Sequence, residues 1–201
     1  MSYRNKKNFF DELAPTWEEL YNPQVLQRIH IIFNQYLNFL ETPLLDLGSG
    51  TGILIPELIS RFSKKNFFIL EADISKTMLK EALSHHHTNG VQYTQADGHN
   101  LPLKANQFNS ILCFQVFPHF HNKLRVINEL LQILKPKGYL VILHLMGHQE
   151  LNAMHREAGH AVKKDRIISA EKLAQKLSEY LKIVLVLEQS DLYLIIAKKL
   201  E

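Results

Sequence analysis

The chain has 201 residues and a formal net charge of +3, with 46% hydrophobic and 21% charged residues. This length suits one domain, and the composition excludes disordered, low-complexity and collagen-like classes. The single cysteine excludes an internal disulfide bond, and the scattered lysines and arginines lack the basic stripe of a nucleic-acid groove. No apolar run is long enough to span a bilayer, and no signal peptide is recognisable. We therefore expect a cytoplasmic protein with no membrane span and no nucleic-acid partner, and its oligomeric state stays open.

Hydrophobic spacing predicts helices and strands that alternate along most of the chain. Residues 8–21 form an amphipathic helical pattern broken at Pro15, and residues 24–40 also have helical spacing. Residues 43–47 form a short apolar strand that ends at a glycine cluster. Ser75 is a good N-cap for a helix that runs through Leu83. Further helices are expected at residues 51–62, 123–134, 148–159 and 169–181, and further strands at residues 66–70, 91–96, 108–116, 139–143, 183–187 and 192–197.

The order of these elements predicts the fold class. Strands that alternate with helices form parallel βαβ units, and the last two strands flank a short polar turn that is typical of an antiparallel hairpin. We expect an α/β fold with a Rossmann-like, doubly wound, mostly parallel seven-stranded sheet and an antiparallel terminal hairpin. Ligands of such sheets bind at the carboxyl ends of the strands. No repeat or long linker divides the chain, so residues 1–201 are expected to form one domain.

A glycine-rich turn follows the first predicted strand, in the sequence Leu45-Asp46-Leu47-Gly48-Ser49-Gly50-Thr51-Gly52. Glycines allow a sharp turn and a close approach of the backbone to a ligand. A dinucleotide-binding G-x-G-x-x-G turn would need glycine at position 53, which is Ile53. The segment instead resembles motif I of the class I S-adenosylmethionine-dependent methyltransferases.

Later segments resemble the same family in the same order. Residues 71–79 (EADISKTML) resemble its acidic motif after the second strand, which implies Asp73 as the ribose ligand and Glu71 as a weaker candidate. Residues 95–102 (QADGHNLP) imply that Asp97 accepts the adenine amino group. The segment after the fourth strand implies backbone contact with the methionine portion. The resemblance implies S-adenosylmethionine as cofactor and these ligands: Asp46, Gly48, Ser49, Gly50, Gly52, Asp73, Ile74, Met78, Asp97, Gly98, Phe114 and Gln115.

Two more segments fit the resemblance, which covers roughly residues 9–145. Residues 134–138 (LKPKG) resemble the family's L-K-P-G-G turn, with Lys137 in place of a glycine. Residues 9–17 (FFDELAPTW) resemble the opening of small-molecule members, including the quinone-biosynthesis type, in which this segment folds over the cofactor. We therefore expect residues 1–40 to form a helical lid, and residues 144–168 to form an insertion lid over the acceptor site.

The fourth strand exit indicates the class of methyl acceptor. It reads Phe114-Gln115-Val116-Phe117 and lacks the N-P-P-Y type of sequence used on amide or base nitrogens, which argues against DNA, RNA or glutamine methylation. The apolar side chains expected around it suit a small, partly apolar molecule. They are Trp17, Phe114, Val116, Phe117 and Phe120. We predict in-line methyl transfer to such a molecule.

The eleven histidines include candidate catalytic groups. His119 follows the fourth strand, His144 ends the fifth and His155 lies in the expected insertion lid, so each could serve as a base or contact the acceptor. A structural or surface role stays open for each of them. A metal site built from two or three of these with His121, His148 or His160 is the less favoured alternative, and we expect no metal. His85, His86 and His87 end a helix and are expected at the surface. Cys113 is expected to be a buried core residue.

Two other functions remain open at this point. A non-catalytic protein that binds S-adenosylmethionine would need the same binding motifs. A dinucleotide-dependent oxidoreductase would share the fold, but Ile53 and the terminal hairpin count against it.

Overall fold

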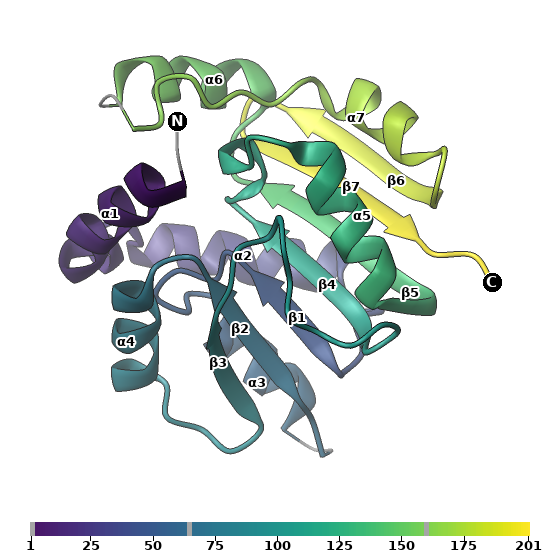
Figure 1. The fold of residues 1–201 in the computed structure, drawn as a ribbon, viewed down its shortest axis with the longest axis horizontal. Helices are drawn as coiled ribbons and strands as arrows, with labels where there is room; N and C mark the ends of the chain where they lie inside the picture. Colours follow the sequence, from purple (N-terminus) through teal and green to yellow (C-terminus); the bar gives the residue numbers. More distant parts are fainter. Residues whose placement is uncertain (1–2, 64–65, 159–160) are drawn as a thin grey trace.

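The computed structural model describes residues 3–63, 66–158 and 161–201 (Figure 1). Seven strands form one sheet in the order β3-β2-β1-β4-β5-β7-β6. The strands are β1 (Leu44–Leu47), β2 (Ile69–Asp73), β3 (Val91–Gln95), β4 (Phe108–Phe114), β5 (Leu134–His144), β6 (Lys182–Gln189) and β7 (Leu192–Lys198). The first five are parallel, and β7 runs antiparallel to both β5 and β6. The predicted fold class, including the antiparallel terminal hairpin, is confirmed.

Helices cover both faces of this sheet (Figure 1). On one face, α2 (Pro23–Tyr36) and α3 (Ile55–Phe62) bury an apolar stripe against the sheet. On the other face, α5 (Lys123–Ile133) and α7 (Ala170–Leu177) do the same. Each fully buried Leu, Ile or Phe side chain contributes about 1.5–3 kcal/mol, which makes these stripes the main source of stability. The two cores hold the strand ends in place.

The remaining helices lie at the carboxyl ends of the strands or beside them. They are α1 (Tyr3–Leu13), the 3₁₀ helix η1 (Ala14–Leu20), α4 (Lys76–His85), the 3₁₀ turn η2 (Phe117–His119) and α6 (His148–Glu157). The chain reverses its strand order between β1 and β4, and ligands of open α/β sheets bind at such a switch point. None of the helices in the described residues has the length and apolar character needed to cross a bilayer.

Several element boundaries differ from the sequence-based expectations. The helix expected at residues 51–62 begins only at Ile55, because the glycine turn continues through residues 51–54. The second strand, expected at residues 66–70, is Ile69–Asp73 and carries two buried carboxyl groups into the sheet. The fifth strand was expected to begin after the turn at Lys137, but β5 already begins at Leu134 and pairs with β4 with a register shift. Lys137 has φ of +65°, the left-handed region that favours glycine.

Candidate active site

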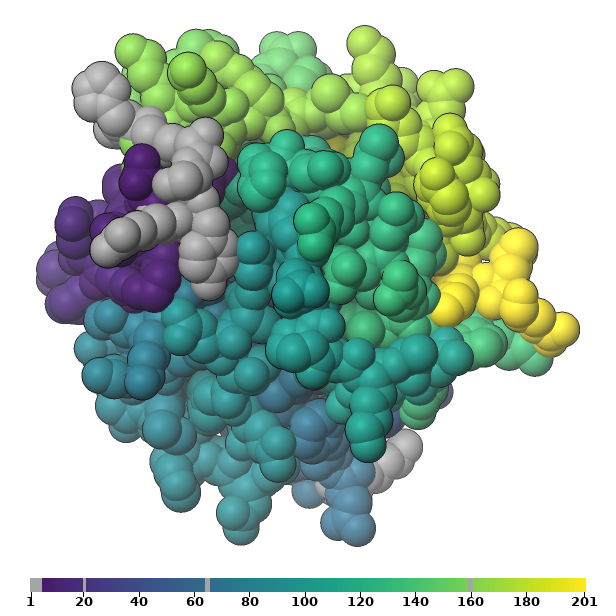
Figure 2. Space-filling model, viewed as in Figure 1, coloured from purple at the N-terminus to yellow at the C-terminus, as the bar shows by residue number. Residues whose placement is uncertain are grey.

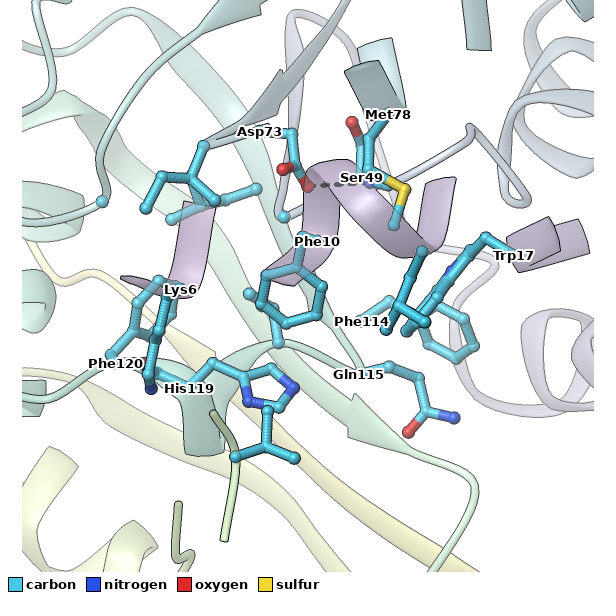
Figure 3. Close-up of a pocket in the computed structure, with 18 of the residues that line it drawn as sticks. Lys6, Phe10, Trp17, Ser49, Asp73, Met78, Phe114, Gln115, His119 and Phe120 are labelled. Carbon is cyan, nitrogen blue, oxygen red and sulfur yellow. Dashed lines mark hydrogen bonds between the residues drawn. The ribbon is translucent and has the colours of Figure 1, made fainter. Parts of the chain in front are cut away.

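A cavity of about 590 Å³ lies at the carboxyl ends of the parallel strands. One wall comes from the glycine turn and from the ends of β2 and β3, and a second comes from the end of β4 with η2. The N-terminal segment α1–η1 and helix α6 form the remaining sides. Figure 3 shows Phe10 of α1 in the middle of this cavity, between Asp73 on one side and His119 on the other. The lining is mainly apolar, as in sites for small organic molecules.

The glycine turn after β1 is shaped by two different requirements. Gly48 has φ of +77°, and a Cβ there would lie 2.2 Å from Cγ2 of Val116 on the neighbouring strand exit. Gly50 has φ of +57° and lines the cavity, where a Cβ would meet only the Trp17 ring, at 3.6 Å. Gly48 therefore allows close packing of β1 against the exit of β4, whereas Gly50 leaves bare backbone at the cavity wall.

Asp73, at the end of β2, joins this turn to the next helix. Its Oδ2 accepts a hydrogen bond from the backbone N–H of Gly50 at 2.9 Å, and its Oδ1 accepts one from Ser75 N–H at 2.8 Å. Burial raises the pKa of the Asp73 carboxyl to about 6, against the lowering effect of these hydrogen bonds. Each carboxylate oxygen has a further lone pair, so the group can still accept two hydroxyl donors from the cavity.

A second carboxyl group lies beyond the end of β3. Asp97 and Gly98 line the cavity, and Oδ1 of Asp97 accepts a hydrogen bond from His99 N–H at 2.9 Å and contacts His99 Nδ1 at 2.7 Å. The His99 ring stacks on the His121 ring, with centroids 3.9 Å apart. The sequence-based reasoning missed this stacked pair, because the two rings come from different loops. Oδ2 of Asp97 remains free of these contacts to His99.

The exit of β4 brings side chains to the far wall. Phe114 and Gln115 both line the cavity. Gln115 has φ of +57°, a strained conformation for a residue with a side chain, and its Oε1 accepts a hydrogen bond from Leu145 N–H at 3.4 Å. Figure 3 shows Gln115 on the same side of Phe10 as His119. The strained backbone turns the chain from β4 into η2 at this edge of the cavity.

Comparisons with known proteins agree with this geometry. A family profile described as "Methyltransferase domain" matches residues 45–142, which run from the glycine turn to β5. Over 104 residues the chain is 36% identical to the ubiquinone/menaquinone biosynthesis C-methyltransferase UbiE of Wigglesworthia glossinidia brevipalpis, covering 50% of this chain and 41% of the relative. Over 149 residues it is 30% identical to a demethylmenaquinone methyltransferase of Chlamydia trachomatis, covering 71% of this chain and 64% of that relative. The chain thus spans less than two thirds of either relative.

A solved structure shares the fold. It is that of an S-adenosylmethionine-dependent methyltransferase from Aquifex aeolicus, with a TM-score of 0.66 and 18% identity over 90% of this chain and all of the other. Residues 45–142 therefore match the methyltransferase domain family, and the chain shares the fold of S-adenosylmethionine-dependent methyltransferases.

The family implies S-adenosylmethionine as cofactor, and the cavity fits this molecule. Ten of the twelve residues predicted to bind the cofactor line it. Asp73 and Asp97 present carboxyl groups that suit ribose hydroxyls and an adenine amino group, and Gly50 offers room for the methionine portion. Met78, from the first turn of α4, adds an apolar contact beside Asp73 (Figure 3).

Two predicted cofactor ligands, Gly52 and Asp46, do not line the cavity. A Cβ at Gly52 would lie 2.5 Å from Ile55, so this glycine serves the packing of the turn against α3. Asp46 is 1% exposed and lies in register with Glu71 on β2, which is fully buried. Burial raises the pKa of both carboxyl groups, and a nearby acid adds to this effect: Asp73 at Asp46, and Asp46 at Glu71. They form a buried pair beneath the turn.

The acceptor side of the cavity holds a histidine with a carboxylate partner. His119 lines the cavity, and its Nδ1 contacts Oδ2 of Asp165 at 2.7 Å. Oδ1 of the same Asp165 accepts a hydrogen bond from Lys6 Nζ at 2.6 Å. Burial lowers the pKa of His119 below its ordinary value, although the hydrogen bond to Asp165 opposes this. Sequence reasoning selected His119 but missed both Asp165 and Lys6.

The other two predicted catalytic histidines differ in position. His155 on α6 lines the cavity, with its ring centroid 5.0 Å from that of His119, and burial lowers its pKa to about 4. His144 at the end of β5 is completely buried beside the Tyr193 ring and does not line the cavity. Burial lowers the pKa of His144 to about 3, so its imidazole is neutral.

His119 and His155 lie with ring centroids 5.0 Å apart, but the other histidines considered for a metal site do not join them in a ligand cluster within the part of the chain that the structure describes. Within those residues no group of three or more His, Cys, Asp and Glu side chains is arranged to hold a metal ion. His148 instead contacts Glu188 at 2.5 Å, which joins α6 to β6. His160 lies outside the described residues. Cys113 is buried within β4, and burial raises the pKa of its thiol.

Proposed function

We propose that the chain is an S-adenosylmethionine-dependent methyltransferase that acts on a small, partly apolar acceptor with an ionisable hydroxyl, of the quinol type. One observation carries the proposal: ten of the twelve predicted cofactor residues and a carboxylate-supported histidine line the same, mainly apolar cavity. The cofactor half and the acceptor half are divided by Phe10, whose ring lies 5.2 Å from that of His119. This arrangement supports a role for His119 as a proton acceptor beside the space left for the second substrate.

The chain's own residues would align the two substrates. Asp73 and Asp97 would hold the ribose and the adenine, and the bare backbone at Gly50 would face the methionine portion. When bound, S-adenosylmethionine supplies an activated methyl group on a sulfonium, so that alignment and exclusion of water are the main tasks of the protein. Phe10 and Trp17, which contact each other edge to face, would exclude water from this space.

His119 would act as the general base. Its Nδ1–H is directed at Asp165, which leaves Nε2 as the nitrogen that accepts a proton. The hydroxyl proton of the acceptor would pass to Nε2, which leaves a ring carbon able to take the methyl group that S-adenosylmethionine would supply. The hydrogen on that carbon would then be lost to solvent, which restores the aromatic ring. Because burial keeps the imidazole neutral, it is available for this step near neutral pH.

The class of acceptor is supported by the cavity lining and by the relatives. Phe9, Leu151, Met154 and Val162 give the acceptor side an apolar wall, which fits an aromatic ring better than a charged substrate. One relative described above is named as a ubiquinone/menaquinone biosynthesis C-methyltransferase, and the other as a demethylmenaquinone methyltransferase. His155, as a neutral imidazole on this wall, would contact a hydroxyl of the acceptor. His144 receives no such role, because it lies outside the cavity.

The proposal is tested by incubating the purified chain with S-adenosylmethionine and reduced short-chain naphthoquinones, benzoquinols, simple phenols and thiols, followed by mass spectrometry. We expect a mass gain of one methyl group on a quinol, and a loss of turnover of about 10²-fold or more in His119→Gln. His87→Gln, at an exposed histidine, is the matched control and should retain turnover. Binding of S-adenosylhomocysteine without methylation of any acceptor would favour the non-catalytic alternative instead.

A further inference from the structure

Three segments far apart in sequence meet at one buried ion pair. Lys6 on α1 donates hydrogen bonds both to Oδ1 of Asp165 and to the backbone carbonyl oxygen of His119. Oδ2 of Asp165 contacts Nδ1 of His119. The Lys6 and Asp165 side chains are each 10% exposed, so this is not a solvated surface pair. Asp165 lies in the segment between α6 and α7, and His119 ends η2.

The burial of the Lys6–Asp165 ion pair is unusual and needs a structural or functional explanation. Lysine usually extends its ammonium group to water, and removing a lysine and an aspartate from water costs several kcal/mol before any interaction is counted. Asp165 uses its two oxygens for two different donors, one on α1 and one on the candidate base. The Asp165 carboxylate therefore bridges the Lys6 ammonium and the His119 ring, while Lys6 also contacts the His119 backbone directly.

The opposite end of α1 is anchored on the cofactor side of the cavity. Oδ1 of Asp11 accepts a hydrogen bond from Ser75 Oγ at 2.6 Å and from Thr77 N–H at 3.2 Å, at the N-terminus of α4. Figure 2 shows the N-terminal segment covering the flank of the molecule next to α4. Helix α1 thus joins the cofactor wall to the acceptor wall, with Phe10 between its two anchors.

We propose that Asp165 and Lys6 are positioning residues for His119, and that they complete the proton acceptor only when α1 is docked over the cavity. Asp165 fixes the ring with Nε2 free for the acceptor, and Lys6 holds Asp165 in the geometry that allows this. A base that forms together with the cavity cover would deprotonate the acceptor only after water is excluded. This inference rests on the proposed function for the role of His119, but the coupling itself is a property of the ligand-free protein.

The charged groups around His119 predict the direction in which its pKa changes when Lys6 or Asp165 is replaced. The titratable groups that face it come from α1, α5, β5, α6 and the segment before α7: Lys6, Lys123, His144, His155 and Asp165. Burial lowers the pKa of His119, Asp165 raises it, and Lys6 and Lys123 lower it further. Loss of Lys6 should therefore raise the pKa of His119, and loss of the Asp165 charge should lower it.

The test is a titration of His119 by NMR in ligand-free protein labelled at histidine nitrogens, with the resonance assigned from His119→Gln. We expect the midpoint to rise in Lys6→Met and to fall in Asp165→Asn, each by about one pH unit. Asp11→Asn loosens the other anchor of α1 without touching Asp165, so it should leave the midpoint closer to the unmodified value than Lys6→Met does. Glu12→Gln, exposed on α1, is the control with no change.

Activity gives a second readout that a merely structural role would not reproduce. Once an acceptor that the chain methylates has been found, kcat can be measured as a function of pH. The acid limb of this profile should move in opposite directions in Lys6→Met and Asp165→Asn, while affinity for S-adenosylhomocysteine stays within about threefold. If Lys6→Met lowers the melting temperature strongly, Lys6→Gln replaces it. Equal midpoints in the unmodified protein and both variants, or shifts of the same sign, would overturn the coupling. The titration decides it even if no acceptor is methylated.

Discussion

The carboxyl groups of Asp46 and Glu71 lie side by side on adjacent strands, both buried, and neither oxygen of Glu71 has a hydrogen-bond partner within the described residues. Two adjacent carboxylates cannot both be ionised in such a place, so the pair retains a proton. Burial raises the pKa of Asp46 to about 8 and that of Glu71 well above its ordinary value. Between about pH 4 and pH 8 the folded state therefore binds more protons than the unfolded chain, and stability falls as pH rises.

Glu71→Gln should reduce this pH dependence. A glutamine amide can donate a hydrogen bond to Asp46, so one buried acid is removed and the other gains a donor. We expect the melting temperature of the ligand-free protein at pH 8 to rise by about 2–4 °C for each kcal/mol recovered, with a smaller change at pH 5. Thermal unfolding measured from pH 5 to pH 9 checks this, with the exposed Glu179→Gln as control. A parallel decline with pH in the variant and the unmodified protein would contradict it.

Asp73 provides a prediction about cofactor affinity. Its two oxygens already accept backbone hydrogen bonds from Gly50 and Ser75, which fixes the carboxylate at the cavity wall. Asp73→Ala should weaken binding of S-adenosylhomocysteine by about 1–3 kcal/mol, the range for lost charge-assisted hydrogen bonds. Isothermal calorimetry checks this, with the exposed Glu171→Ala as the unaffected control. Unchanged affinity in Asp73→Ala would remove it from the set of cofactor ligands.

Individual residues show which parts of the site could be predicted from the sequence and which could not. The cofactor side was predictable because its residues lie within short motifs at strand ends, where the turn chemistry fixes their position. Asp46 and Gly52 were the exceptions, since nothing in their motif distinguishes a buried acid from a ligand, or a glycine needed for packing from one that faces the ligand. Lys6 and Asp165 are 159 positions apart, and no local pattern reports a contact of that separation. The only signal was one acidic residue in a basic stretch of the expected insertion lid, Lys163-Lys164-Asp165-Arg166.

Among the elements, α4 is connected through its N-cap residue to α1, the helix that covers the cavity. Ser75 is its N-cap, as the sequence predicted, and Ser75 Oγ accepts a hydrogen bond from Met78 N–H at 3.0 Å while donating one to Asp11 on α1. One hydroxyl therefore stabilises both the helix that carries Met78 and the docking of the N-terminal segment. By contrast, the early start of β5 was not predictable, because its pairing with β4 overrides the turn character of Lys135-Pro136-Lys137-Gly138.

Ser75→Ala should destabilise the protein by about 1 kcal/mol through loss of the cap, and should also increase hydrogen exchange in α1. Ser84→Ala on the same helix is a matched control, because Ser84 is exposed and bonds only to the carbonyl oxygen of Glu81. Urea unfolding measures the first effect, and hydrogen exchange with mass spectrometry measures the second. If hydrogen exchange increases only in α4, Ser75 stabilises its own helix and does not hold α1 in place.

For the whole molecule, ligand linkage decides between the family's cofactor and a dinucleotide. The cavity presents Ile53 where a dinucleotide turn would have glycine, and its two carboxyl groups lie at the ends of successive strands. A ligand that binds only the folded state at 100 times its Kd stabilises it by about 2.7 kcal/mol, which corresponds to about 5–11 °C for a chain of this size. We expect S-adenosylhomocysteine to raise the melting temperature by this amount and NADH to leave it unchanged.

Gly50→Val should abolish the shift with S-adenosylhomocysteine, because the φ of +57° at this position suits glycine and the added side chain would occupy the cavity wall. A larger shift with NADH than with S-adenosylhomocysteine would assign the same cavity to a dinucleotide, and the carboxyl groups would then contact its ribose.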